Sequence, residues 1–169
     1  MIVNYGDLES GINLKTLLYE HGLVHIQNAN LTIDKFKDFA YNFGKPLITE
    51  KHVLDDKGIV QKVSSDGLFE SGDVEWHNDW SYGRGNYFGT ILYNAKNAHF
   101  SSTYFVDMSK APDTLFKKYE FEIGKYYPPK ELQDKCFTEK QLRILKKQNI
   151  HRPFVFEHPL NEKKILYCS

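Results

Sequence analysis

Tyr87-Phe88-Gly89-Thr90-Ile91-Leu92-Tyr93-Asn94-Ala95 is the most strand-like run of this sequence. Aromatic, β-branched and aliphatic residues follow one another almost without interruption, which is typical of a strand with one buried face. A second β-rich run, Ser102-Thr103-Tyr104-Phe105-Val106, follows after a turn at residues 94–97. We expect the two runs to be neighbouring strands, so this part of the chain favours a β-rich fold.

Shorter signals surround these two runs. Apolar patterns between turn residues predict strands at 22–27, 59–63, 151–157 and 164–168. Helices are predicted at 32–43, from about 111 to 119, and at 138–148. In the first of these helices Thr32 is the expected N-cap, and Phe36, Phe39 and Phe43 recur at helical spacing. Many short strands with a few helices predict a β-rich α+β domain, a sandwich or barrel with helices packed outside.

Length and charge exclude several classes of protein. The 169 residues are expected to form one domain, 1–169. Lys and Arg (22) balance Asp and Glu (22), so the strong positive field of a nucleic-acid-binding protein is not expected. The lysine-rich stretch 125–147 is interpreted as a solvated helix face and loop. Since we see neither a membrane-spanning run nor a signal-peptide pattern, and the two cysteines have no metal-finger spacing, we expect a cytoplasmic protein.

The segment Trp76-His77-Asn78-Asp79-Trp80-Ser81-Tyr82 is the best candidate for chemistry. Two residues apart on an extended chain, His77 and Asp79 point to the same side and can converge on one ion. Another histidine would complete the two-histidine, one-carboxylate triad of non-haem iron(II) oxygenases. A His-x-Asp pair also arises by chance in surface turns. The aromatic neighbours favour a pocket over such a turn.

Four stretches, in this order, resemble the taurine dioxygenase (TauD/TfdA) family of iron(II)- and 2-oxoglutarate-dependent dioxygenases. The first resembles the family's amino-terminal strand and helix, and the second its Trp-His-x-Asp metal motif. The third resembles the strand with a 2-oxoglutarate-binding threonine, and the fourth the segment with His-Pro and Leu-Tyr pairs. The stretches are Gly22–Ile26 with Leu31-Thr32 and Phe43-Gly44, Trp76–Tyr82, Ser101–Met108, and His151–Tyr167.

This resemblance implies a double-stranded β-helix, the cupin-like jelly roll, with flanking helices. It also implies hydroxylation of a small organic substrate with iron(II), 2-oxoglutarate and O2, which releases succinate and CO2. By the same resemblance His77 and Asp79 are the catalytic metal ligands, and Thr103 binds 2-oxoglutarate. The residues that match substrate-pocket positions are Asp73, Trp76, Asn78 and Tyr82.

The chain departs from the family pattern in two places. Phe100-Ser101 stands where the family has a Gly-Gly pair before the threonine strand. The family's third metal ligand, a histidine, and its 2-oxoglutarate-binding arginine lie beyond the Leu-Tyr segment, downstream of Ser169 in this numbering. We therefore expect a family domain that is incomplete at its C-terminus and poorly stable or soluble by itself. No motif supports another residue in these roles: His99, His151 and His158 as ligand, or Arg84, Arg143 and Arg152, which we interpret as surface arginines.

Two alternatives to a self-contained enzyme stay open. One is a non-catalytic binding domain that keeps the fold and pocket without the iron chemistry. The other is a homo-oligomer in which a partner copy supplies the missing strands and ligand. In each case we expect a small molecule as ligand, with neither nucleic acid nor membrane as partner.

Overall fold

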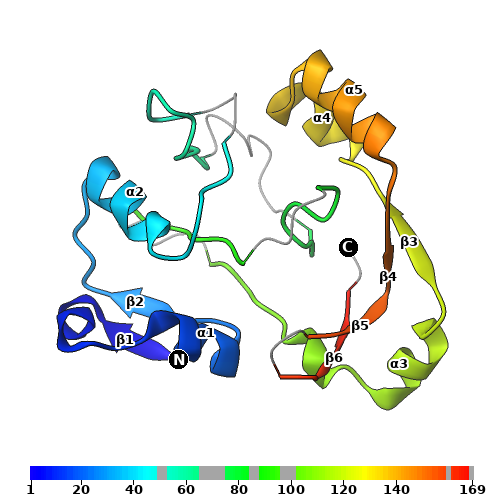
Figure 1. Ribbon diagram of the computed structural model, residues 1–169, viewed down its shortest axis with the longest axis horizontal. Helices are drawn as coiled ribbons and strands as arrows, with labels where there is room; N and C mark the ends of the chain where they lie inside the picture. The colour runs from blue at the N-terminus through cyan, green and yellow to red at the C-terminus, as the bar shows by residue number, and fades with distance from the viewer. Residues whose placement is uncertain (49–52, 65–74, 84–87, 96–101, 159–160, 168–169) are drawn as a thin grey trace.

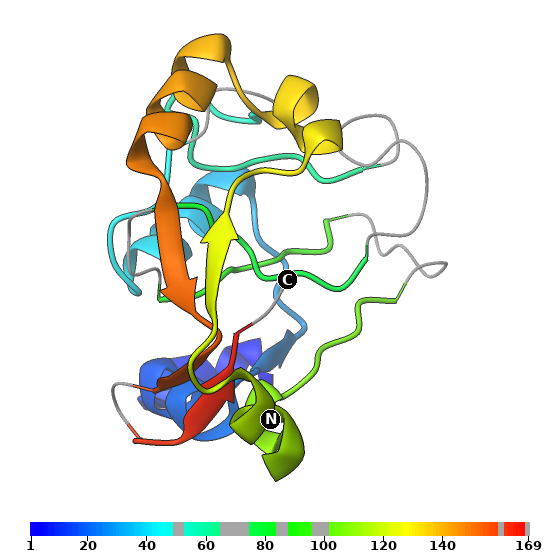
Figure 2. The same cartoon turned by 90° about the vertical axis from the view of Figure 1, so that its right-hand side faces the viewer.

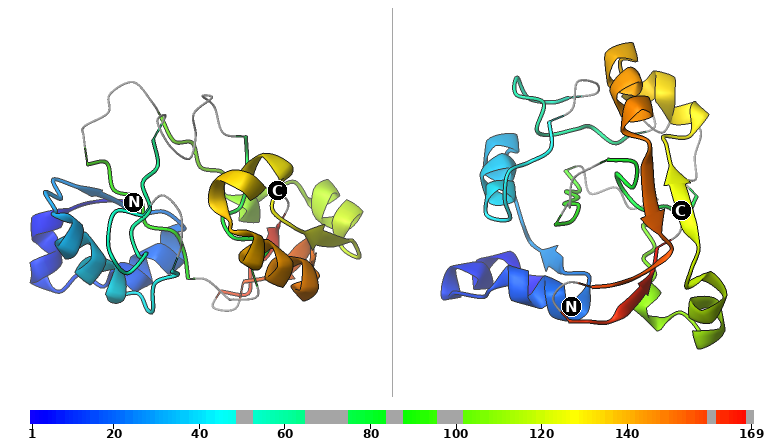
Figure 3. Two further views of the ribbon diagram at one scale, coloured as in Figure 1. Left: turned by 90° about the horizontal axis from the view of Figure 1, so that it is seen from above. Right: turned by 45° about the vertical axis from the view of Figure 1, so that its right-hand side comes forward.

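The computed structural model describes residues 1–48, 53–64, 75–83, 88–95, 102–158 and 161–167. Its regular elements form two groups on opposite sides of the molecule, with irregular segments between them (Figures 1 and 3). The N-terminal group contains β1 (Ile2–Asn4), η1 (Tyr5–Ser10), α1 (Leu14–His21), β2 (His25–Gln27) and α2 (Ile33–Tyr41). The C-terminal group contains η2 (Met108–Lys110), α3 (Asp113–Tyr119), β3 (Ile123–Tyr126), α4 (Lys130–Cys136), α5 (Glu139–Gln148), β4 (Ile150–Pro153), β5 (Val155–Glu157) and β6 (Lys164–Leu166).

Capping residues set the limits of the N-terminal helices. The side chain of Asn13 accepts a hydrogen bond from the backbone of α1, and Gly22 ends that helix with a left-handed φ of 70°. Thr32 caps α2 by accepting from the backbone N–H of Lys35, as the sequence predicts. The helix ends at Tyr41, two residues before the predicted end at 43, because its last turn tightens into hydrogen bonds to Phe39 and Ala40.

The predicted aromatic face of α2 packs against residues 88–95. The Phe36 ring lies 5.5 Å from the Tyr93 ring, and the Phe43 ring lies 5.8 Å from the Phe88 ring. The Tyr93 hydroxyl also accepts a hydrogen bond of 2.9 Å from the Leu31 backbone N–H. These contacts attach the most strand-like run of the sequence to a helix through its side chains.

The C-terminal group contains two antiparallel strand pairs, β3 with β4 and β5 with β6. Figure 2 shows β3 and β4 side by side, with α4 and α5 at one end of the pair. Tyr126 on β3 and Leu166 on β6 are buried, and so is Phe137 between α4 and α5. The Tyr126 hydroxyl donates to the Tyr167 carbonyl at 2.9 Å and thereby connects the two strand pairs.

The α+β class is confirmed, whereas the described residues show three two-stranded sheets rather than a jelly roll. The strand predictions for 59–63, 87–95 and 102–106 are wrong for the residues that the structure describes, and Tyr87 lies outside these residues. In the first of these a single bridge joins Gln61 to Val53, and no ladder forms in the described parts of the other two. Strand propensity reflects packing against a neighbouring strand, so it does not fix a strand when that neighbour is lacking.

Much apolar surface remains accessible. The accessible surface is 12821 Å², compared with about 8,600 Å² for a typical folded monomer of this mass. Phe121 is 90% exposed, Tyr104 75%, Leu92 62% and Phe105 58%. The extended segments 88–95 and 102–107 thus present several large apolar side chains to solvent.

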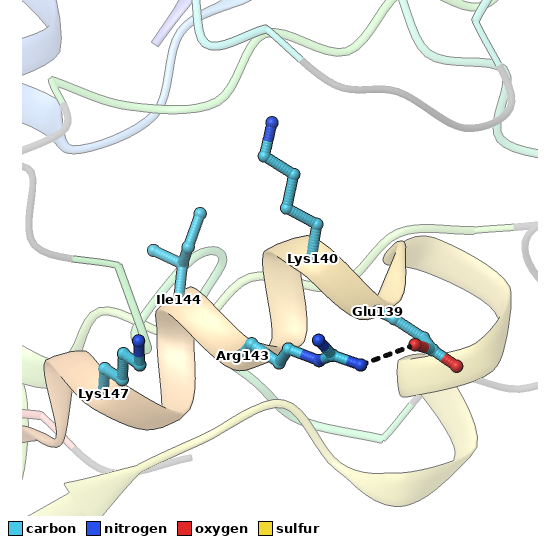
Figure 4. A pocket seen from close by; sticks show the side chains of 5 residues that line it. All are labelled: Glu139, Lys140, Arg143, Ile144 and Lys147. Carbon is cyan, nitrogen blue, oxygen red and sulfur yellow. Dashed lines mark hydrogen bonds and ion pairs between the residues drawn. The ribbon is translucent and has the colours of Figure 1, made fainter.

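The part of the lysine-rich stretch that lies on α5 forms an exposed helical surface. A shallow cavity of about 460 Å³ on α5 is lined by Glu139, Lys140, Arg143, Ile144 and Lys147, all from this one helix (Figure 4). Arg143 pairs with Glu139 at 3.1 Å, and both side chains are about four-fifths exposed. The predicted solvated helix face is therefore confirmed. Within the described ranges, no helix is long and apolar enough to span a membrane.

Candidate functional site

The candidate site is an irregular segment, residues 75–83, between the two groups of elements (Figure 1, green). It consists of an extended stretch through His77 and a turn that begins at Asp79. The backbone N–H of Gly83 donates to the Trp80 carbonyl at 2.9 Å and closes this turn. Asp79 is the first residue of the turn and His77 lies two residues before it, and both side chains are about half exposed.

His77 and Asp79 converge. His77 Nε2 lies 3.3 Å from Asp79 Oδ1, and the two side chains are 50% and 46% exposed. The other ring nitrogen, Nδ1, lies 2.7 Å from the Glu75 carbonyl oxygen. Because a carbonyl only accepts, Nδ1 must carry the proton of this hydrogen bond. In the neutral ring the Nε2 lone pair is then free on the side of the Asp79 carboxylate.

Thr90 fixes the second carboxylate oxygen of Asp79. Its hydroxyl donates to Asp79 Oδ2 at 2.7 Å. One oxygen of the carboxylate is therefore held by a neighbour, and the other faces His77. A hydrogen bond of this kind orients a ligating carboxylate and limits its rotation.

The turn after Asp79 contains strained backbone. Trp80 has a φ of +55°, a left-handed conformation that costs a non-glycine residue about 1–3 kcal/mol. Aromatic packing opposes this cost. The Trp80 ring lies 5.5 Å from Tyr82 and 5.9 Å from Phe137, and Tyr82 lies 5.6 Å from Phe137. Since Phe137 is only 4% exposed, the three rings anchor the turn to the C-terminal group.

Arg152 on β4 provides a second attachment. Its Nε donates to the Ser81 carbonyl at 3.0 Å, and its Nη2 donates to the Gly83 carbonyl. Both acceptor residues are buried. The interpretation of Arg152 as a surface arginine is therefore wrong, since its guanidinium supplies donors to buried carbonyls. Arg143 is exposed as expected, and Arg84 lies outside the described residues.

Tyr167 lies within electrostatic reach of the same residues. Burial raises the pKa of its phenol; the Arg152 charge opposes this rise in the pKa, and the Asp79 charge adds to it. Tyr167 follows β6, and its backbone N–H donates to the Phe154 carbonyl at 2.6 Å. The end of the β5–β6 hairpin thus lies beside the candidate site.

The pair has the donor chemistry of a divalent metal site. Two ligands that each lie about 2.0–2.2 Å from one ion can be up to about 4 Å apart, and the observed separation is 3.3 Å. A neutral imidazole and a carboxylate suit iron(II) and related ions. The remaining contacts, Glu75 with His77 and Thr90 with Asp79, are the outer hydrogen bonds that orient such ligands. Among the described residues, no three or more His, Cys, Asp and Glu side chains lie together as a group that could hold a metal ion.

The other predicted site residues are more dispersed. Trp76 is 68% exposed, Asn78 is half-buried, and Tyr82 packs in the aromatic cluster. Thr103 is exposed in the irregular segment 102–107, and no described hydrogen bond joins it to His77 or Asp79. Asp73 lies outside the described residues.

Comparison with known proteins decides the family. The model of the family described as "Taurine catabolism dioxygenase TauD, TfdA family" matches residues 7–169. The chain belongs to this family. The resemblance drawn from the four stretches is therefore confirmed. Searches of curated proteins and of solved structures gave no match.

Sequence reasoning did not identify Thr90 and Arg152 as parts of the site. Thr90 lies 11 residues from Asp79, and Arg152 lies 71 and 69 residues from its two acceptors. Thr90 belongs to no motif with chemical meaning, and Arg152 lies in the fourth family-like stretch at a position with no assigned role. Their contacts depend on how distant segments pack, so no local signal in the sequence could have indicated them.

Proposed function

We propose that this protein is an iron(II)- and 2-oxoglutarate-dependent dioxygenase that hydroxylates a small organic substrate. The observation that carries the proposal is the 3.3 Å approach of His77 Nε2 to Asp79 Oδ1 in a member of the taurine dioxygenase family. In this proposal His77 and Asp79 are two protein ligands of the ion, and a further histidine completes the triad. Members of this family generally use iron(II), 2-oxoglutarate and O2. We propose the same cofactors here, together with the family's jelly-roll core.

The bound metal and 2-oxoglutarate would supply the oxidising chemistry, and the protein's part is to bind, orient and exclude water. The Glu75 carbonyl holds the proton of His77 on Nδ1, which keeps Nε2 available as a ligand. Thr90 prevents rotation of the Asp79 carboxylate. The ring cluster of Trp80, Tyr82 and Phe137 keeps solvent away from the turn behind the ligands.

Thr103 and the pocket residues have proposed roles that follow from the family. The Thr103 hydroxyl would donate to a carboxylate of 2-oxoglutarate. Trp76, Asn78, Tyr82 and Asp73 would line the substrate pocket. The exposed Trp76 ring offers a flat apolar surface beside His77, which suits contact with a small organic molecule.

The chain has two tryptophans, and both lie in the candidate segment, so intrinsic fluorescence reports on this site. Iron(II) and 2-oxoglutarate would be titrated anaerobically into the protein, followed by air and a succinate assay. We expect fluorescence quenching that saturates with metal and, in a protein that also carries the family's downstream histidine and arginine, 2-oxoglutarate-dependent release of succinate. His77→Ala and Asp79→Ala should each lower metal affinity by at least 100-fold.

His151→Ala is the matched control. His151 is exposed and places its Nδ1 2.8 Å from the carbonyl of Asn149, two residues earlier, which reproduces the hydrogen bond of His77 without the carboxylate. This variant should bind iron(II) like the wild type. Equal affinity of the wild type, His77→Ala and Asp79→Ala would refute the metal site. Saturable metal and 2-oxoglutarate binding without succinate, in a protein that carries the downstream histidine, would instead identify a binding domain.

A further inference from the structure

Arg152 connects the metal-binding segment to the C-terminal sheet. It lies on β4, opposite Gly124 of β3, and its guanidinium reaches the carbonyls of Ser81 and Gly83. These carbonyls belong to the turn that starts at Asp79. The side chain therefore joins two parts of the chain about 70 residues apart in sequence.

The turn depends on such an attachment. Trp80 is held at a φ of +55°, a conformation that a tryptophan does not adopt without support from its surroundings. Ser81 is 5% exposed and Gly83 is also buried, so their carbonyls need donors from the protein. Arg152 supplies both donors from one planar group, a geometry that a lysine ammonium does not reproduce.

We propose that Arg152 is a positioning residue for the metal site, holding the 79–83 turn so that the Asp79 carboxylate faces His77. The inference rests on the proposed function, because it assigns Arg152 to the same metal centre. Asp79 is the first residue of the turn, so any rotation of the turn moves its carboxylate away from His77 Nε2. Thr90 restrains the carboxylate at its tip, and Arg152 restrains the backbone behind it.

The surroundings of Tyr167 agree with this role. The Arg152 and Asp79 charges both act on its phenol, with opposite effects on its pKa. The guanidinium and the ligand carboxylate thus lie near the same half-buried ring.

The test compares Arg152→Gln, Arg152→Lys and the matched control Arg143→Gln. Arg143 is an exposed arginine on α5 that pairs only with Glu139 among the described residues, so the control makes the same chemical change away from the site. Two readouts are measured below the thermal transition of each variant: acrylamide quenching of Trp76 and Trp80 without metal, and Co(II) affinity by fluorescence titration. The first follows the turn alone, and the second follows the ligand geometry.

We expect Arg152→Gln to increase acrylamide quenching and to lower Co(II) affinity about 10- to 100-fold. Arg152→Lys should fall between this variant and the wild type, and Arg143→Gln should match the wild type in both readouts. Unchanged quenching in Arg152→Gln overturns the proposal, and so does increased quenching with unchanged Co(II) affinity. If the wild type itself binds no Co(II), the proposed function fails. In that case acrylamide quenching alone shows whether Arg152 stabilises the turn.

Discussion

Residues 150–167 and residues 88–107 both have sequences that are typical of strands. Among the described residues, only the first region forms paired strands. In the first region β4, β5 and β6 all find hydrogen-bonded partners, and Leu166 is buried in the result. In the described parts of the second region, 88–95 and 102–107, the chain is extended without a ladder. Tyr104, Phe105 and Val106 are each more than half exposed there.

The difference shows what strand-forming residues can and cannot specify. In the β5–β6 hairpin the paired residues lie only 7 to 11 positions apart along the chain, so each strand finds its partner locally. In the second region Phe88 and Tyr93 pack on α1 and α2 instead, through rings at 5.3 Å from Tyr19 and 5.5 Å from Phe36. The side chains of Phe88 and Tyr93 contact helices. In the described residues of this region, the backbone N–H and C=O groups form no ladder with another strand.

Truncating one leucine in each region gives the largest contrast. Leu166 is 3% exposed on β6, whereas Leu92 is 62% exposed in the extended segment. Leu166→Ala should lower the free energy of unfolding by about 2–5 kcal/mol, because it leaves a cavity in the core. Leu92→Ala removes the same atoms and should change it by less than about 0.5 kcal/mol. Urea denaturation of both variants measures the difference. A comparable loss for Leu92→Ala would show that the second region packs like a core.

Thr90→Val tests whether the second region, although it lacks strand pairing, contributes to the proposed metal site. Valine keeps the shape of threonine and removes the hydroxyl that donates to Asp79 Oδ2. We expect metal affinity to fall roughly 10-fold, at the lower end of the range for outer hydrogen bonds, because the site is half exposed. Thr90→Ser keeps the hydroxyl and should bind metal like the wild type. If Thr90→Val also binds like the wild type, Thr90 has no role at the ligand.

The sequence predicted those parts of the molecule whose causes are local. Thr32 and Thr138 were expected at helix starts, and each caps its helix in the structure. The convergence of His77 and Asp79 also follows from their two-residue spacing, while their role in binding metal stays a prediction. By contrast, the donors from Arg152 and the Phe137 ring on Trp80 come from segments more than 50 residues away. Such contacts depend on tertiary packing, for which neither composition nor spacing gives a signal.

Thr138→Ala measures how much of the first region is determined locally. The Thr138 hydroxyl accepts from the Gln141 backbone N–H at 3.3 Å, and the Gln141 side chain accepts from the Thr138 backbone N–H at 2.8 Å. Loss of this capping box should cost about 1 kcal/mol of stability. Thr114→Ala, an exposed change inside α3, is the control, and thermal unfolding by circular dichroism compares the two. Equal melting temperatures would mean that tertiary contacts, not the cap, fix the start of α5.

Asp55 shows a third arrangement, in which a side chain stabilises a segment that has only a single bridge. Its Oδ1 accepts from the backbone N–H groups of Ile59 and Val60 at 2.9 and 2.8 Å, next to the Val53–Gln61 bridge. The carboxylate is 4% exposed, with Lys37 Nζ at 3.9 Å from Oδ2. The hydrogen bond from Val60 is the main cause that holds the pKa of Asp55 below its usual value, and Ile59 and Lys37 act in the same direction on this pKa.

The sign of the resulting pH effect follows from that direction. A carboxyl whose pKa is lower in the folded protein stabilises the fold above its unfolded pKa of about 3.9, and this stabilisation is lost as the pH falls through the folded pKa. Asp55→Asn keeps an acceptor oxygen but no charge, so its melting temperature should fall less between about pH 5 and pH 2 than that of the wild type. Asp56→Asn removes an exposed neighbouring charge and should retain the wild-type profile. Identical acid profiles for Asp55→Asn and the wild type would mean that the segment is held by its backbone bridge and not by the charge of Asp55.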